Sequence, residues 1–178
     1  MIRVKFVAIF TTLFLLVACE QTADLTSTET YEKAGVQFSY PGNWRVAEDQ
    51  TSADVRYIII ETPGDAIFIA QIYSRKDAVE LQEYAQWASD QAKKQMPAGE
   101  RTPGEFLAIE KQIDKVILKG IKENFSIKLF NEEVPHRSEY YKVEGEQKVA
   151  YLISQTAIED LSKVQGGFDL LLHTFSMN

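Results

Sequence analysis

The chain has 178 residues, of which 25% are charged, and its net charge is −7. Its basic residues, such as the pair Lys93-Lys94 and the single Arg137, do not form a basic stripe, so the acidic balance disfavours nucleic acid as a partner. Cys19 is the only cysteine, which excludes an internal disulfide, and the length suits one domain with a real core.

Residues 1–18 have the layout of a secretory signal peptide. Arg3 and Lys5 precede an apolar run from Phe6 to Val17. This run of roughly 12 residues is shorter than the roughly 20 apolar residues that a membrane-spanning helix requires. We therefore predict that residues 1–18 are removed on export.

The run ends in Leu16-Val17-Ala18-Cys19, which resembles the bacterial lipobox. The resemblance implies a diacylglyceryl group on the Cys19 thiol, cleavage before Cys19, and acylation of its amine, for example by palmitate. Two or three acyl chains give stable membrane attachment. Glu20 stands where Asp would signal inner-membrane retention, so we expect the periplasmic face of the outer membrane, or the outer face of the cell membrane in a Gram-positive host. The alternative is an ordinary secretory signal with a chance cysteine.

The processed chain would have 160 residues, with 17 Lys and Arg against 26 Asp and Glu, or a net charge of −9. Residues 19–33 are polar and rich in threonine, without apolar periodicity. We interpret them as a flexible, lipid-anchored tether. The folded domain is then expected over residues 34–178.

Strand patterns fill the first part of this domain. Apolar and polar residues alternate over residues 36–40, the turn Pro41-Gly42-Asn43 follows, and extended structure resumes at Trp44. Residues 55–60 and 66–73 are β-branched and aromatic runs around a Pro-Gly turn, which indicates a hairpin. Because both runs are apolar on both faces, we expect central strands covered on both sides.

A helix is predicted next, capped by Asp77 with Glu80 three residues later and ended by Pro97. The second half reads mostly as strands over residues 105–110, 112–121, 124–131, 137–143 and 148–154. Turns are expected over residues 131–135 and 144–146, and residues 114–121 could be partly helical. A capping box over residues 156–159 predicts a final helix, which Gly166-Gly167 should loosen.

Together these patterns indicate an α+β fold with a mainly antiparallel sheet packed with helices. The segment Gly35–Trp44, which reads Gly-Val-Gln-Phe-Ser-Tyr-Pro-Gly-Asn-Trp, resembles the first strand and turn of the PsbP-like family. The later element order fits as well, up to a strand at Tyr151–Ser154, a helix and a terminal Phe175-Ser176. Bacterial lipoproteins of the DcrB type share this plan behind a lipobox. The resemblance implies the fold and a non-enzymatic protein, but no residue of a known binding site is carried over.

Residues that could perform catalysis are few. His136 and His173 are expected at a strand start and at the end of the last helix, where structural roles suffice. The acidic pairs Glu132-Glu133, Glu144 with Glu146, and Glu159-Asp160 lie where turns and helix starts favour acids. We therefore name no catalytic residue, metal or cofactor, although a carboxylate-based hydrolase stays open.

Exposed aromatic side chains are the remaining candidates for a contact with a partner. Helical spacing places Trp87 beside the buried stripe of its helix, which predicts a half-exposed ring. Tyr140 and Tyr141 must point to opposite faces of a strand, so that one could reach solvent. The leading hypothesis is a non-enzymatic binding or assembly module that engages an envelope protein. The alternative is a carrier or sensor of a small apolar ligand held between sheet and helix.

Overall fold

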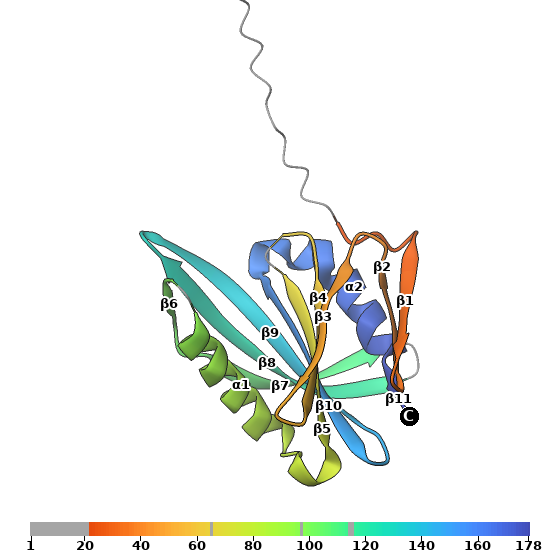
Figure 1. Ribbon diagram of the computed structural model, residues 1–178. Coiled ribbons are helices and arrows are strands. Elements are labelled where there is room, and N and C mark those ends of the chain that lie inside the picture. Colours follow the sequence, from red (N-terminus) through yellow and green to blue (C-terminus); the bar gives the residue numbers. More distant parts are fainter. Residues whose placement is uncertain (1–21, 65, 97, 114–115) are drawn as a thin grey trace, which may run out of the picture.

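The computed structural model describes residues 22–178 with the exception of residues 65, 97, 114 and 115 (Figure 1). The predicted signal peptide and Cys19 therefore lie outside the described residues.

The larger of two antiparallel sheets has the strand order β3-β4-β5-β10-β9-β8-β6, and β7 pairs with the remaining length of β8. Its strands are β3 (Arg45–Ser52), β4 (Val55–Glu61), β5 (Ile67–Ser74), β6 (Glu100–Arg101), β7 (Glu105–Ile113), β8 (Val116–Leu129), β9 (Glu132–Glu144) and β10 (Lys148–Ala157). Most neighbours in the sheet are joined by hairpins, as the sequence patterns predicted. The expected hairpin of residues 55–60 and 66–73 is confirmed as β4 and β5.

The two faces of this sheet are covered by different elements (Figure 1). Helix α2 (Leu161–Thr174) and a small sheet cover one face; the small sheet has the order β1-β2-β11, with β1 (Thr28–Lys33), β2 (Val36–Pro41) and β11 (Ser176–Met177). Helix α1 (Leu81–Gln95) packs on the other face. Two short 3₁₀ turns, Arg75–Asp77 and Ile158–Asp160, precede the helices. The predicted α+β class with a mainly antiparallel sheet is confirmed.

The main core lies between α2, the small sheet and the large sheet. Phe168 is 2% exposed and packs its ring edge-on against Trp44 at 5.4 Å between ring centroids. Gly167 makes this approach possible, because a Cβ there would lie only 2.4 Å from Cη2 of Trp44. The glycine that was expected to loosen the helix therefore admits the indole ring into the core.

The start of the described chain differs from the predicted tether. Residues Thr28–Lys33 form β1 and pair with β2, and Tyr31 stacks on Phe38 at 4.7 Å. Upstream of β1, the Ala23 amide donates to the Lys163 carbonyl, and Asn43 Nδ2 donates to the Thr22 carbonyl. The prediction of a flexible segment is therefore wrong from Thr22 onwards, because backbone pairing holds a polar stretch that has no apolar pattern of its own.

The helix starts were predicted too early. Helix α1 begins at Leu81 with Glu80 as its N-cap, and no side chain caps it, while Asp77 belongs to the preceding 3₁₀ turn. Thr156 is the penultimate residue of β10 and bonds to the Ala157 carbonyl, so the predicted capping box does not form. Strand pairing with β9 up to Ala157 prevails over the local capping signal.

The strand boundaries in the second half also need correction. Residues 116–129 form one strand, β8, where two strands and a partial helix were expected. The predicted turn at residues 131–135 is mostly strand, and His136 lies inside β9 rather than at its start. Proline is tolerated at position 135 because β10 pairs with β9 only as far as His136, which leaves Pro135 at an edge.

Candidate functional site

A groove lies between α1 and the part of the large sheet that α1 does not cover. One row of its floor crosses four strands, because Ile59, Ile69, Ile153 and Tyr140 are successive Cα partners. Ile153 and Tyr140 lie at the α1 end of this row and are buried, whereas Ile59 and Ile69 are only half-buried. The groove has a volume of about 360 Å³.

The wall of the groove comes from one edge of α1. Trp87, Gln91 and Gln95 repeat every four residues and so share one side of the helix, next to the small residues Ala88 and Ala92. Tyr84, Ala85 and Ser89 are the buried residues of α1 and pack it on the sheet. The helix thus presents a row of uncharged side chains to the groove.

The lining of the groove is free of charge although the chain as a whole is strongly acidic. Isoleucine, alanine, tryptophan and tyrosine supply the apolar surface, and the glutamines Gln71, Gln91, Gln95 and Gln155 supply the polar groups. An amide side chain carries both donors and acceptors, so the groove offers both beside an apolar floor. This combination suits an uncharged ligand that has apolar groups and its own hydrogen-bonding groups.

Trp87 stands between this groove and a second, smaller one of about 200 Å³ that Tyr73, Tyr84 and Tyr151 help to line. The ring is 45% exposed, which confirms the predicted half-exposure, and its centroid lies 5.9 Å from that of Tyr84. Tyr84 in turn stacks on Tyr151 at 3.7 Å. Burial raises the pKa of Tyr73 to about 12 and that of Tyr84 further still, so both rings are neutral at physiological pH.

A buried polar cluster holds α1 on the part of the large sheet formed by β6, β8 and β9. Arg101 donates to Glu123 at 2.8 Å, and Ser89 from α1 donates to the same carboxylate at 2.5 Å. Tyr140 donates to Glu123 at 2.7 Å as well. Glu123 is completely buried and Arg101 is 3% exposed, so this ion pair is shielded from solvent. The cluster joins α1, β6, β8 and β9, and so determines where the groove wall stands.

Glu123 was not among the residues singled out from the sequence, because one predicted strand ended at Ile121 and the next began at Asn124. In the continuous strand β8, Ile121, Glu123 and Phe125 lie on one face, and both apolar neighbours are buried. A carboxylate between two inward-facing apolar residues is the signal that could have revealed it, given the right strand boundaries. Arg101 could not have been found this way, because it lies on a two-residue strand.

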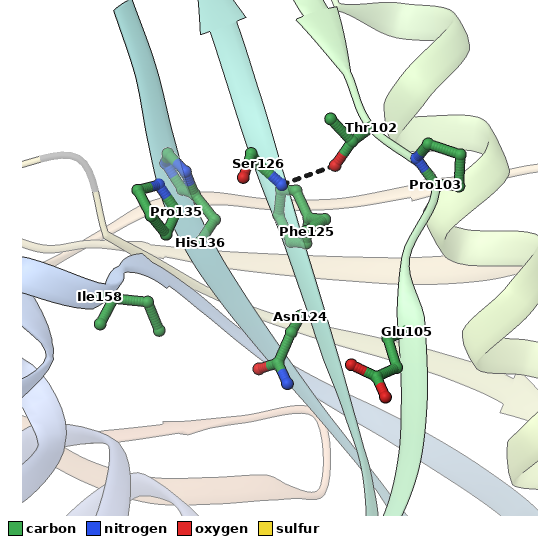
Figure 2. A pocket seen from close by; sticks show the side chains of 9 residues that line it. All are labelled: Thr102, Pro103, Glu105, Asn124, Phe125, Ser126, Pro135, His136 and Ile158. Atoms are coloured by element: carbon green, nitrogen blue, oxygen red, sulfur yellow. Dashed lines mark hydrogen bonds between the residues drawn. The ribbon is translucent and has the colours of Figure 1, made fainter.

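A third hollow, with a volume of about 510 Å³, lies near the β8–β9 hairpin (Figure 2). His136 is buried in its wall, where its ring stacks on Phe125 at 5.5 Å and Nδ1 contacts the Val134 carbonyl at 2.9 Å. The guanidinium of Arg101 lies over the same Phe125 ring at 3.3 Å. Figure 2 also shows Thr102 accepting a hydrogen bond from the Ser126 amide, so its hydroxyl supports the backbone. These side chains have structural partners, as we expected of His136.

The other residues singled out from the sequence are spread over the molecule. Tyr140 and Tyr141 do point to opposite faces of β9, but both are buried, at 2% and 1% exposure, so the expectation that one reaches solvent is wrong. Tyr140 contributes to the groove floor through its ring, and Tyr141 donates to Glu139 on the other face. His173 is exposed in the last turn of α2.

None of the helices in the described part of the chain combines the length and the hydropathy needed to cross a bilayer. Within the described residues, no three or more His, Cys, Asp or Glu side chains converge as metal ligands would.

Comparisons with known proteins identify the fold. No protein-family model and no curated protein sequence matches the chain. Among solved structures, the chain is similar to the cyanobacterial PsbP protein CyanoP from Synechocystis sp. PCC 6803, with 13% identity and a TM-score of 0.54 over 85% of this chain and 93% of that chain. This likeness shows a PsbP-like fold, as the resemblance of the first strand and turn implied.

Two further solved structures align less well. LpqN, described as involved in cell envelope biogenesis of Mycobacterium tuberculosis, has 11% identity and a TM-score of 0.48 over 85% of this chain and 91% of that chain. A protein from Bacteroides thetaiotaomicron also has 11% identity and a TM-score of 0.48, over 89% of this chain and 49% of that chain.

Proposed function

We propose that this chain is a non-enzymatic binding module of the cell envelope, held at a membrane by acyl chains on Cys19, with the groove beside α1 as its binding site. The observation that carries the proposal is the uncharged lining of that groove in a chain of net charge −7. An exposed, uncharged apolar surface on an otherwise charged protein is typical of an interaction site.

The occupant that fits best is an apolar segment of an envelope protein. A polypeptide segment carries apolar side chains for the isoleucine floor and backbone groups that need both donors and acceptors, which the amide groups of Gln91 and Gln95 provide. Trp87 adds a half-exposed indole at the rim, the residue type most enriched among energetic anchors of interfaces. Trp87 is exposed, and Ile59 and Ile69 are only half-buried, so a segment can contact the groove without opening the core.

The test places a photo-reactive amino acid at Gln91, inside the groove, and at Glu32, an exposed site on β1 away from it. In intact cells we expect the Gln91 probe to capture one reproducible envelope protein, through an apolar peptide identified by mass spectrometry. The Glu32 probe should not capture it. A Trp87→Ala variant should reduce this capture about thirtyfold or more, because truncating a tryptophan anchor typically costs about 2 kcal/mol or more of binding energy.

The matched control is Lys94→Ala, an exposed change on the same helix outside the groove. The Lys94→Ala variant should leave capture unchanged. Both Trp87→Ala and Lys94→Ala should leave the melting temperature nearly unchanged. Equal capture from Gln91 and Glu32, or no reproducible protein neighbour at all, would contradict the proposal.

A carrier of a small apolar ligand is the second candidate, and the groove volume of about 360 Å³ falls in the range of ligand sites. In that case the Gln91 probe would form an adduct with a small molecule or lipid instead of a peptide. The amide groups of Gln91 and Gln95 argue against this outcome, because a purely apolar ligand would shield them from water without offering them hydrogen bonds.

The anchor has an independent test. Cys19→Ser removes the thiol that would carry the diacylglyceryl group, so it should abolish metabolic labelling with palmitate and release the chain from the membrane fraction. A Cys19→Ser chain that stays bound to membranes would refute the anchor while leaving the groove untouched.

A further inference from the structure

The tip of the β8–β9 hairpin exposes two large apolar side chains in succession. Phe130 is 98% exposed and Leu129 is 44% exposed. Leu129 pairs with Glu132, so Phe130 and Asn131 form a two-residue loop. Phe130 has a φ of 54°, a conformation that glycine normally supplies at the first position of such a loop. The fold therefore tolerates local strain to hold a phenylalanine where a turn alone would favour glycine.

This tip projects beyond the end of β10, although β6 pairs with β8 up to Lys128 on its other side. Pairing of β9 with β10 ends at His136 and Ala157, whereas its pairing with β8 continues to Glu132. The four residues Glu132–Pro135 thus extend past β10 by about 14 Å, at about 3.4 Å per residue. Figure 1 shows the β8–β9 end extending past the end of β10, with β6 beside β8.

The tip lies at the same end of the molecule as the start of the described chain. Thr22 and Ala23 are held by Asn43, just before β3, and by Lys163, in the first turn of α2. The strand registers place the start of β3 at the end of the sheet where β10 ends and β9 begins. Helix α2 follows the end of β10 through the short 3₁₀ turn. Figure 1 places the orange start of the chain and the teal tip at one end.

The distance to the proposed anchor is short. Only Glu20 and Gln21 separate Cys19 from Thr22. Three residues span at most about 11 Å when fully extended. Acyl chains on Cys19 would therefore hold this end of the domain against the bilayer, within the reach of a hairpin that projects about 14 Å.

Further exposed apolar side chains lie at this end. Leu25 is 49% exposed next to the N-terminal contacts, and Ile158 is 40% exposed between β10 and α2. Around the tip, Lys128 pairs with Glu133 at 3.6 Å, and Glu132 adds a negative charge. This balance does not favour anionic head groups, so the apolar side chains and not the charges must supply the attraction.

We propose that Leu129 and Phe130 insert into the outer part of the bilayer to which Cys19 tethers the chain, so that anchor and tip fix the orientation of the domain. This inference rests on the proposed anchor. With two points of contact, the membrane faces the end of the sheet where β9 begins.

The test uses the fact that Cys19 is the only cysteine and would be consumed by acylation, so that one introduced thiol can be labelled selectively. The acylated chain with Phe130→Cys, carrying an environment-sensitive NBD fluorophore, is reconstituted into phosphatidylcholine vesicles with nitroxide-labelled acyl chains. The matched control is Glu146→Cys, an exposed site in the β9–β10 turn at the opposite end of the sheet. We expect the label at residue 130 to be quenched about threefold more, because an interfacial side chain lies about 5–10 Å deep.

Vesicle flotation separates the two ways in which this can fail. If the chain floats with the vesicles but residues 130 and 146 are quenched equally, the insertion is refuted and the anchor stands. If the chain does not float, the anchor is refuted and the insertion falls with it. A label at residue 130 that stays polar in vesicles but becomes apolar in native envelopes would assign the tip to a protein partner and overturn the bilayer as its occupant.

Discussion

The two faces of the large sheet differ in how completely they are covered. On β4, Ile58 and Ile60 point toward α2 and are fully buried, whereas Ile59 between them points toward α1 and is half-buried. A helix is about 10–12 Å wide and strands lie about 4.8 Å apart, so one helix covers only two or three strands. Helix α2 and the small sheet together close one face, while α1 alone leaves the other face open over β4 and β5. The closed face serves stability, and the open face is available for binding.

The largest expected effect concerns the cluster that holds α1 on the open face. Glu123→Ala removes the carboxylate that Arg101, Ser89 and Tyr140 share, and leaves a buried guanidinium without its partner. Breaking a buried ion pair in this way should reduce the free energy of unfolding by about 4 kcal/mol in urea titrations. The double change Arg101→Met with Glu123→Leu should recover most of this loss, because no unpaired charge remains. If the double variant is as unstable as the single one, the pair is not the cause.

A matched pair of substitutions on β4 compares the faces directly. Ile60→Ala should cost about 3 kcal/mol, because it leaves a cavity in the closed core, while Ile59→Ala should cost about 1 kcal/mol. Both values come from chemical unfolding under identical conditions. Equal losses would mean that the open face is as well packed as the closed one, and would contradict the groove as a binding surface.

The close approach of Trp44 to α2 gives a third, smaller effect. Gly167→Ala places a methyl group where the indole ring now lies, so it should destabilise the closed face by about 2 kcal/mol despite the better helix propensity of alanine. Gly166→Ala is the control: the nearest atom, Cδ1 of the half-exposed Leu25, can move away. A melting temperature that rises in Gly167→Ala would show that Trp44 can shift at no cost.

The smallest expected effect concerns the rim of the closed face, where Asp49 on β3 joins the two sheets. It accepts hydrogen bonds from Arg56 at 2.8 Å and from Tyr31 at 2.7 Å, and it pairs with Lys33. Arg56, followed by Lys33 and Tyr31, holds the pKa of Asp49 well below its usual range. The stabilisation is therefore present above the unfolded-state pKa of about 3.9 and is lost as the pH falls below it.

We expect Asp49→Asn to cost about 1 kcal/mol at neutral pH, with the difference from the parent chain shrinking below about pH 4. Urea titrations between about pH 7 and pH 3 would measure it. A difference that stays constant over this range would show that the charge of Asp49 does not contribute.

Strong local patterns made parts of this fold and site predictable. The β4–β5 hairpin follows from two β-branched runs around a Pro-Gly turn, and the half-exposure of Trp87 follows from helical spacing. Strand β1 was missed because Thr28–Lys33 is polar and is ordered by pairing with β2. Glu123 was missed because a charged residue between two apolar runs resembles a turn until the strand partners on both sides are known.

By itself, the sequence determined the fold class, the acidic surface and the lipobox-like segment, because these depend on composition and on periodicity over a few residues. Only the tertiary structure decided which face of the sheet is closed. Residues 58–60 are all isoleucine, and their different burial depends on helices that follow later in the chain. The groove, the Glu123 cluster and the position of Phe130 at the end where the described chain begins likewise arise from long-range packing, which no local pattern records.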